Sequence, residues 1–449
     1  MAAGNTSINF DKPNMIGWGY TNRVMPDGEA RSILEQAFAR WDLGGLRVLV
    51  LLPDGTRTAP IAMLFDLVCK LLYGKAARLD FMISLGTHRM MSAEALERHL
   101  GLTVEERLRL YPDLSVFQHD WKDTGNLHTL GVLPLDDLHA ATHGILPAQV
   151  PVTINRQALN YDIILICGPV YPHEVIGYSG GSPYLFPGIG GTEILDAIHM
   201  MEGLLTSSQV IGRKYTPARA LIERAIQLLP CGLLAALPVV VPGGLPRPSG
   251  LVGLFSGELE PAWSLAADLS SQVNVVYVDN PYQTVLSLVP KMYEDLWTGA
   301  KGMYKVEPAV ADGGEVILYA PHIKDLSFAY GEILRKTGYH VIEYYTSQWE
   351  RFKDYPIGVI SHGPEVVGRG SYRDGVESRR IQLRLATGIP EELCHQVSLE
   401  YLDPAGINQG DYTGRDAEGV LLIPKAGEIL YQLASQRELY NVPLEFPAG

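Results

Sequence analysis

Three mostly apolar runs stand out in the first half of the chain, and a polar loop follows each of them. The runs are LRVLVLL at 46–52, LDFMISL at 79–85 and YDIILIC at 161–167. Mostly apolar runs of this length are typical of strands that are buried on both faces, as in parallel sheets covered by helices. The pattern therefore predicts three buried strands, each with a polar loop at its carboxyl end.

Helix signals alternate with these runs. Pro60 stands where proline is tolerated, at the opening of a helix over the apolar residues that follow. Ser92 can cap the next helix and Gly101 can end it. Thr103 and Glu106 have the spacing of a capping box, which predicts a further helix directly afterwards. The alternation of strands and helices favours the α/β class.

A second set of strand and helix patterns begins near residue 270. It comprises runs at 273–278 and 316–320, a helix near 326–337 and a further apolar run at 357–361. At 449 residues the chain is too long for one ordinary core. We therefore predict two α/β domains with mostly parallel sheets, 1–270 and 271–449, and an active-site cleft between them.

Composition narrows the class of protein. The chain is 47% hydrophobic and carries a net charge of −14, which argues against a nucleic-acid partner or an anionic membrane surface. The opening MAAGNTSINFDKPN lacks the apolar core of a signal peptide, and no uncharged apolar run reaches about 18 residues. Its four cysteines are widely spaced, without a C-x-x-C pair. We expect a cytoplasmic protein.

The loops after the three apolar runs carry the candidate chemistry. Asp54 and Arg57 follow the first run, His88 and Arg89 the second, and His173 the third. Ligands of open α/β sheets bind outside the carboxyl ends of the strands, so these side chains would face one crevice if the strands are parallel neighbours. Histidine can transfer protons near neutral pH, and the planar guanidinium of arginine suits a carboxylate or a phosphate.

The segment 168–191 reads GPVYPHEVIGYSGGSPYLFPGIGG and is the densest in glycine. Glycine lets the backbone approach a ligand closely. The segment is neither a Walker A loop, because no Lys-Ser or Lys-Thr pair follows, nor a G-x-G-x-x-G dinucleotide fingerprint. It therefore predicts a ligand-binding loop of an uncommon kind.

Several blander alternatives stay open. Arg57 could pair with Asp54, and Lys301 could be a solvated surface lysine. His322 follows a strand pattern of the second half. A further histidine group lacks an acidic or cysteine partner at metal-site spacing, which disfavours zinc; its members are His119, His128, His139 and His143.

Four segments together carry a family resemblance: DGTRTAP, LGTHRMMSAE, GPVYPHEVIGYSGGSPYLFPG and the AIH of the following helix. This set resembles the nickel-pincer-nucleotide-dependent 2-hydroxy-acid racemases, the lactate racemase-like family. The resemblance implies that hydride moves reversibly between a 2-hydroxy acid and the nickel cofactor, while a histidine takes the hydroxyl proton. Because both enantiomers must react, it implies two such histidines, with the cofactor and both histidines in the N-terminal domain.

The resemblance also assigns roles position by position. His88 and His173 correspond to the two acid/bases, and His199 to the protein ligand of nickel. Arg57 and Lys301 correspond to the groups that hold the substrate carboxylate. The cofactor-binding set that it implies is Asp54, Thr56, Arg57, Ser179, Gly180 and Gly181.

The sequence departs from the family pattern at two places. Thr298 stands where the family usually has glutamine, three residues before Lys301. Pro183 stands at the position of the lysine that tethers the cofactor covalently, and proline has no side-chain nucleophile. We therefore expect a noncovalent cofactor, loaded by cofactor-biosynthesis proteins.

Two other functions remain as alternatives to a racemase of small, lactate-like 2-hydroxy acids. One is a carrier of the cofactor or of nickel without turnover. The other is an unrelated α/β enzyme that acts on a phosphorylated or carboxylated metabolite. The side chain of the 2-hydroxy acid stays open at this stage.

Overall fold

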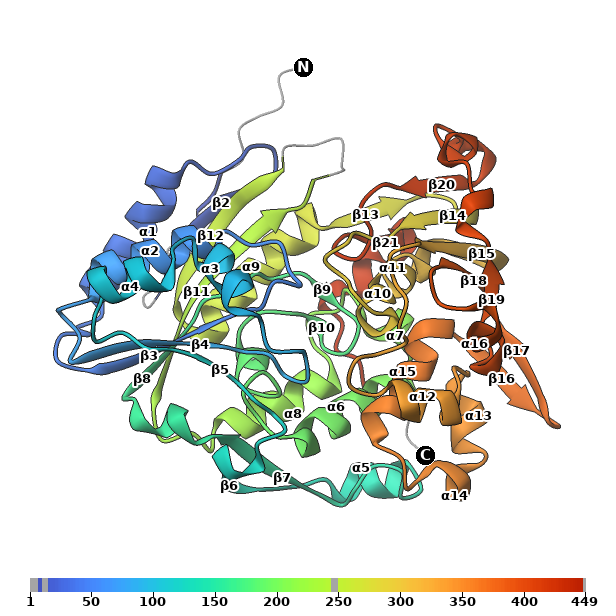
Figure 1. The fold of residues 1–449 in the computed structure, drawn as a ribbon, viewed down its shortest axis with the longest axis horizontal. Helices are drawn as coiled ribbons and strands as arrows, with labels where there is room; N and C mark the ends of the chain where they lie inside the picture. The colour runs from blue at the N-terminus through green and yellow to red at the C-terminus, as the bar shows by residue number, and fades with distance from the viewer. Residues whose placement is uncertain (1–6, 10–14, 244–248, 447–449) are drawn as a thin grey trace.

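The computed structural model of the protein describes residues 7–9, 15–243 and 249–446 (Figure 1). Most of the N-terminal segment on which the signal-peptide expectation depends lies outside these ranges. No helix in the described ranges is both long and apolar enough to cross a membrane. In Figure 1 a larger sheet lies on the left and a smaller one on the right.

The larger sheet has eight strands. In spatial order they are β1 (Ser7–Asn9), β2 (Met15–Tyr20), β12 (Gly250–Glu258), β11 (Gly232–Val241), β8 (Ile163–Ile166), β3 (Arg47–Leu52), β4 (Arg78–Ile83) and β5 (Val116–Gln118). The five strands from β11 to β5 are parallel, whereas β1, β2, β12 and β11 pair antiparallel. The three predicted strands are confirmed as the parallel neighbours β8, β3 and β4, with Val50 opposite both Phe81 and Leu165.

Helices cover both faces of this sheet. The helices of the first half are α1 (Asp27–Arg40), α2 (Ile61–Leu72), α3 (Ala93–Leu100), α4 (Val104–Leu110), α5 (Asp136–Ala141), α6 (Thr192–Leu205), α7 (Ser207–Val210), α8 (Pro217–Ile226) and α9 (Leu259–Val273). Val48 and Val50 of β3 join a core with α1 and α2, whereas Leu49 and Leu51 join a core with α6 and α9. The strand is therefore buried on both faces, as its sequence predicts.

The predicted boundaries of helices α3 and α4 are also confirmed. The Ser92 hydroxyl accepts a hydrogen bond from the Ala95 N–H at the start of α3, and Gly101 ends that helix at a φ of 77°. Thr103 and Glu106 form the reciprocal capping box at the start of α4. Local chemistry alone sets these boundaries.

The smaller sheet has five strands, all parallel. In spatial order they are β19 (Glu400–Leu402), β18 (Gln382–Thr387), β15 (Val310–Ala320), β14 (Tyr282–Leu288) and β20 (Val420–Ile423). The two-stranded pairs are β6 (Leu127–Pro134) with β7 (Gln149–Asn155), β9 (Pro172–His173) with β10 (Gly177–Tyr178), β13 (Val275–Val278) with β21 (Leu430–Leu433), and β16 (Gly370–Arg373) with β17 (Val376–Arg379). The chain is thus a mixed α/β protein with mostly parallel sheets.

The helices of the second half surround this sheet and reach toward the first half. They are α10 (Leu296–Gly299), α11 (Lys301–Tyr304), α12 (Gly331–Thr337), α13 (Ile342–Thr346), α14 (Trp349–Phe352), α15 (Ile357–Val367) and α16 (Glu391–Gln396). The apolar run at 357–361 belongs to α15, since a short apolar run does not by itself distinguish a strand from a buried helix. A division of the chain near residue 270 stays a prediction.

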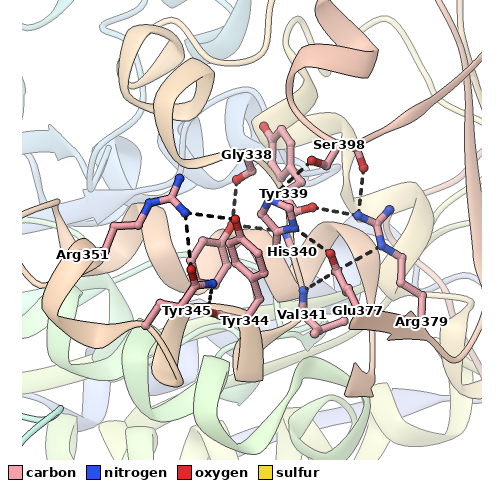
Figure 2. Close-up of polar contacts among 11 residues, drawn as sticks. Gly338, Tyr339, His340, Val341, Tyr344, Tyr345, Arg351, Glu377, Arg379 and Ser398 are labelled. Atoms are coloured by element: carbon pink, nitrogen blue, oxygen red, sulfur yellow. Dashed lines mark hydrogen bonds and ion pairs between the residues drawn. The ribbon is translucent and has the colours of Figure 1, made fainter. Parts of the chain in front are cut away.

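A polar network ties α13 to the β16–β17 hairpin (Figure 2). The His340 ring stacks on Tyr344 with centroids 3.7 Å apart, and its Nδ1 atom lies 2.7 Å from the Oε2 atom of Glu377. Arg379 donates hydrogen bonds to the carbonyls of Tyr339 and Ser398. These contacts hold α13 and the residues before it against the β16–β17 hairpin.

Candidate active site

A cavity of about 200 Å³ brings together loops and helices of both halves. The predicted site residues that line it are Asp54, Thr56, Arg57, His88, His173, Ser179, Gly180, His199 and Lys301. Gly181 lies outside the lining and packs against the Trp263 ring. Arg89 is exposed, with its guanidinium over Phe328. Segments that are far apart in the sequence therefore converge on one site.

His88 is held by a buried carboxylate. Its Nδ1 atom lies 2.7 Å from the Oδ2 atom of Asp54, while Thr56 donates its N–H and its hydroxyl to Oδ1. Burial alone would raise the pKa of Asp54, but His88 and the Thr56 hydrogen bonds lower it below its usual value. A carboxylate can only accept a hydrogen bond, so the ring proton of His88 lies on Nδ1. The Nε2 atom of His88 is therefore left free to accept a proton.

Arg57 carries an unused guanidinium N–H. Its Nη1 atom is buried and has no hydrogen-bond partner in the part of the chain that the structure describes. It makes no ion pair with Asp54 within that part. Burial opposes the charge, but Tyr293 and Glu174 raise the pKa of Arg57, so it stays cationic. A buried donor without a partner, beside a cavity, suits a carboxylate or phosphate ligand.

The loop of Arg57 is fixed from the other half of the chain. Glu428, which is 1% exposed, accepts hydrogen bonds from the N–H (2.7 Å) and the hydroxyl (2.8 Å) of Thr58. Lys425 lies 3.5 Å from the same carboxylate. The position of the guanidinium therefore depends on both halves.

Lys301 supplies a second cation. It begins α11, is 6% exposed and makes no ion pair within the described ranges. Burial lowers its pKa, and the charge of Arg57 lowers it further, although Glu174 acts in the opposite direction. Two cations that repel each other across a cavity are stabilised by an anion placed between them.

His173 differs from His88 in its contacts. Its Nδ1 atom accepts a hydrogen bond from the Val175 N–H at 3.2 Å, and the Glu174 Oε2 atom lies 3.4 Å away. Burial lowers its pKa to about 3, Glu174 opposes this, and Arg57 adds to it. The ring is therefore neutral with its proton on Nε2, so the two histidines present opposite hydrogen-bonding groups to the cavity.

His199 presents a free ring nitrogen. It lies within α6, and its Nδ1 atom donates to the Leu195 carbonyl at 2.8 Å, which leaves Nε2 available as a metal ligand. Burial lowers its pKa, so the imidazole is neutral, as nickel coordination requires. No group of three or more metal-ligating side chains occurs among the described residues. The free Nε2 atom of His199 in the cavity wall therefore fits a single protein ligand of a metal.

The glycine-rich loop folds tightly around the cavity. Gly180 has a φ of 79°, and a Cβ atom there would lie 2.6 Å from the Cγ2 atom of Val170. The Trp263 indole donates to the Ser179 carbonyl at 3.0 Å. Pro183 lines the cavity within a 3-10 turn, so no amine stands at this position. The loop fits a ligand held by backbone groups.

Three of the remaining histidine candidates contact backbone carbonyls, whereas His128 and His143 are exposed. His322 lies 3.0 Å from the Tyr293 carbonyl, His139 lies 2.7 Å from the Leu146 carbonyl, and the buried His119 lies 3.0 Å from the Gly190 carbonyl. None of the three lines the cavity. Each has a backbone partner that accounts for its position.

Among the residues of the cavity wall that the sequence reasoning did not assign are Glu174, Trp297, Tyr304 and Glu365. Glu174 directly follows His173, so the motif itself could have indicated it. Its Oε1 atom accepts a hydrogen bond from Tyr304 at 2.7 Å, which joins the two halves beside His173. Glu365 comes from α15 and carries no sequence signal of its own.

Comparisons with known proteins agree with this architecture. Residues 32–212 match the family model of the lactate racemase N-terminal domain. Lactate racemases from Thermoanaerobacterium thermosaccharolyticum and Lactiplantibacillus plantarum are 22% and 21% identical over 285 and 282 residues. These alignments cover 62% of this chain and only 60% of each relative.

Two solved structures share the fold. A crystal structure from Thermotoga maritima superimposes with a TM-score of 0.83 at 28% identity, over 92% of this chain and 100% of that one. The lactate racemase apoprotein from T. thermosaccharolyticum gives a TM-score of 0.67 at 16% identity, over 96% of this chain and 100% of that one. The protein is therefore lactate racemase-like: its residues 32–212 match the lactate racemase N-terminal domain family, on a fold shared over nearly the whole chain.

Proposed function

We propose that this protein is a racemase or epimerase of a small 2-hydroxy acid that uses a noncovalently bound nickel-pincer nucleotide. The observation that carries the proposal is the cavity itself. It combines two histidines in opposite hydrogen-bonding states, two buried cations and a third histidine with a free Nε2 atom. A carrier would need the third histidine and the nucleotide pocket alone.

The chemistry of the reaction explains this set of groups. The hydrogen on the second carbon of a 2-hydroxy carboxylate is scarcely acidic, so removing it as a proton is difficult. Its removal as hydride, together with loss of the hydroxyl proton, leaves a 2-keto acid that can be reduced on either face. When bound, the nickel-pincer nucleotide would supply the hydride acceptor, because no protein side chain can accept hydride.

The residues of the chain bind and orient the substrate and move its proton. Arg57 and Lys301 hold the carboxylate, which fixes the second carbon within the cavity. The Nε2 atom of His88 accepts the hydroxyl proton of one enantiomer, and His173 protonates the oxygen of the other from an imidazolium form, which the bound substrate carboxylate would favour. A full turnover therefore starts with a neutral His88 and a protonated His173 and ends with a protonated His88 and a neutral His173, and the reverse direction restores the first state.

His199 would hold nickel through Nε2, and the backbone of the glycine-rich loop, with Asp54 and Thr56, would hold the nucleotide. Because Pro183 offers no nucleophile, this binding is noncovalent. Cofactor-biosynthesis proteins would load the enzyme in the cytoplasm.

The test is to load the full chain with the nickel cofactor and incubate it with single enantiomers of short 2-hydroxy acids. Chiral chromatography should find the opposite enantiomer of at least one acid, and the unloaded chain should produce none. Stoichiometric nickel without any such conversion would instead identify a carrier. A chain that retains neither nickel nor cofactor would reject both functions.

A further inference from the structure

Glu174 places a carboxylate beside the second histidine of the cavity. It directly follows His173, lines the cavity and is 6% exposed. Its Oε2 atom is buried and has no hydrogen-bond partner in the described part of the chain. That atom lies 3.4 Å from the Nδ1 atom of His173. A buried carboxylate oxygen without a donor is rare in native proteins, so its place beside an imidazole nitrogen points to a second state of that ring.

The neutral ring found in the structure accounts for the unsatisfied oxygen. The Nδ1 atom of His173 accepts a hydrogen bond from the Val175 N–H at 3.2 Å, so the ring proton is on Nε2. In this state Nδ1 and the Oε2 atom of Glu174 are two acceptors that face each other without a proton between them. A ring turned away from the Val175 N–H would carry its proton on Nδ1 and donate it to Oε2.

The proposed reaction needs this second state. When His173 accepts the hydroxyl proton of a substrate, its Nε2 atom must be free, and the ring proton must then be on Nδ1. The same holds directly after the imidazolium has given its Nε2 proton to the substrate oxygen. In both cases Nδ1–H needs an acceptor. The Val175 N–H cannot serve, because it is a donor, whereas the Oε2 atom of Glu174 can.

The second half of the chain holds this carboxylate in place. The Tyr304 hydroxyl on α11 donates to the other carboxylate oxygen, Oε1, at 2.7 Å. Lys305, which follows that helix, donates to the carbonyl of Pro172, the residue before His173. Both Tyr304 and Lys305 are buried. The strand β9 and the carboxylate after it are therefore fixed by the same helix end.

The charges around the pair keep Glu174 ionised. Burial alone would raise its pKa, but His173 and the neighbouring cations lower it. Burial lowers the pKa of His173, Glu174 opposes this, and the cations add to it. The other titratable or charged groups that face the pair are Arg57 from the loop after β3, Lys301, Tyr304 and Lys305 from α11 and its end, His199 from α6, and Glu365 from α15.

We propose that Glu174 is the positioning residue of His173: its Oε2 atom accepts the Nδ1 proton and so leaves Nε2 to the substrate, as Asp54 does for His88. The Val175 N–H holds the resting ring, and the carboxylate holds the reacting ring. The two acid/bases are then matched, each with a buried carboxylate beside Nδ1. The inference rests on the proposed function for the acid/base role of His173.

Glu174→Gln tests the contact in the loaded enzyme, with the 2-hydroxy acid that the wild type racemises. The amide oxygen can still accept from Tyr304, but the NH₂ group then faces Nδ1 and keeps the proton of His173 on Nε2. We expect kcat to fall by roughly 10²-fold or more. KM should stay unchanged or fall, because a negative charge beside Arg57 and Lys301 is removed. A lower KM at an unchanged kcat would mean that Glu174 only balances these cations, and it overturns the proposal.

Glu174→Asp separates the contact from the charge. It keeps a negative charge near the cations but is one methylene shorter, which withdraws the acceptor from Nδ1 of His173. We expect kcat to fall by about tenfold or more, since misplacement by about 1 Å is costly in a catalytic site. Wild-type kcat in this variant overturns the proposal, and the variant decides alone if Glu174→Gln does not fold.

Histidine NMR on the unloaded full chain gives a readout without turnover. The His173 signal is assigned by its loss in His173→Gln. Burial lowers the pKa of His173 to about 3, so the comparison uses the fraction of charged ring at the lowest pH at which both chains stay folded. Glu174→Gln should shift the protonation of this ring down by about one to three pH units, which lowers that fraction. Equal fractions in wild type and Glu174→Gln overturn the proposal.

Glu365→Gln is the matched control for the NMR comparison. It makes the same substitution in the same cavity wall, and the fraction of charged His173 should stay as in wild type. A decrease as large as that in Glu174→Gln would show that any change in the wall shifts the ring, and it overturns the assignment to Glu174.

The outcome is separable from that of the proposed function. If the loaded chain racemises no 2-hydroxy acid but Glu174→Gln lowers the charged fraction of His173, the racemase proposal fails and the pairing of the two residues stands. If the wild type racemises a 2-hydroxy acid and both Glu174 variants keep its kcat, the racemase stands and the pairing is rejected.

Discussion

The Nδ1 atom of His88 lies 2.7 Å from the Oδ2 atom of Asp54, whereas Nδ1 of His173 accepts a hydrogen bond from a backbone N–H. The first contact places the proton of His88 on Nδ1, and the second leaves the proton of His173 on Nε2. The two neutral rings therefore present different groups to the cavity, an acceptor at His88 and a donor at His173. A cycle that moves one proton between them starts with one of the two rings protonated.

Asp54→Asn tests the tautomer of His88. The amide can present its NH₂ group to Nδ1, which would place the ring proton on Nε2 and remove the acceptor from the cavity. We expect kcat for racemisation to fall by roughly 10²–10⁴-fold, as is typical when a general base is lost or misoriented. Steady-state kinetics with nickel content as the control measures this. A variant within twofold of wild-type kcat would show that Asp54 does not set the tautomer.

Both histidines should be required in both directions. His88→Gln and His173→Gln should each lower the racemisation rate by about 10²-fold or more from either enantiomer, because a complete turnover uses both rings. Nickel and cofactor contents should stay at wild-type levels. His322→Gln is a matched control, since His322 contacts the Tyr293 carbonyl outside the cavity lining. Near wild-type racemisation by either cavity variant would reject the two-base assignment.

His199→Ala should remove nickel from the protein without unfolding it. The Leu195 carbonyl loses only one hydrogen bond, so we expect the melting temperature to change by no more than a few degrees. Metal analysis after cofactor loading should find less than a tenth of the wild-type nickel. Retention of stoichiometric nickel would move the metal ligand to another residue.

Much of the fold could be predicted because the signals are local. The strand β3 has alternate residues in two different cores, which requires the uninterrupted apolar run seen in the sequence. The capping box at Thr103 depends on two residues three positions apart. By contrast, β11 was not predicted, since its apolar residues follow a helical stretch and its pairing with β12 is a nonlocal contact.

The residues of the candidate site likewise fall into those that local sequence signals predict and those that depend on nonlocal packing. His88 and His173 could be proposed because each follows an apolar run at the position where parallel sheets bind ligands. Glu365 could not, since it reaches the cavity only through the packing of α15 on α6. Asp54 pairs with His88 and not with Arg57. This pairing depends on the three-dimensional arrangement, which the spacing of the residues in the sequence does not give.

Glu365→Gln should change the pH dependence of stability. The pKa of Glu365 is raised by burial to about 8, so the folded state favours the protonated acid more than the unfolded state does. Its contribution to the free energy of unfolding is fully present below the usual glutamate pKa and is lost as pH rises toward 8. The glutamine variant should therefore lose less thermal stability than wild type between pH 5 and pH 9.

Comparing the pH dependence of stability of wild type and variant separates the contribution of Glu365 from that of the buried histidines. Burial lowers the pKa values of His173 and His362 to about 3, so they reduce stability as pH falls below about 6.5, in the opposite direction and in both proteins. The melting temperatures of wild type and of Glu365→Gln should be similar at pH 5 and differ at pH 9. Parallel curves would mean that Glu365 has the same pKa in the folded and unfolded states.

We expect the cofactor to be held without a covalent bond. In the proposed function Pro183, which lines the cavity, takes the place of a tethering lysine, so the complex should dissociate by mass action. Activity of the loaded enzyme should fall on dilution or prolonged dialysis and return when cofactor is added. Denaturing mass spectrometry should give the mass of the bare polypeptide, with the cofactor free in the filtrate.

Pro183→Lys is the complementary variant, because it restores an amine at the cavity wall. Proline fixes φ at the start of the 3-10 turn Ser182–Tyr184, so the substitution also removes a local constraint. If the turn keeps its shape, the lysine variant should retain more activity than wild type after dialysis. An adduct on the wild-type chain that survives denaturation, at any residue, would contradict noncovalent binding, because only a covalent bond persists once the cavity is unfolded.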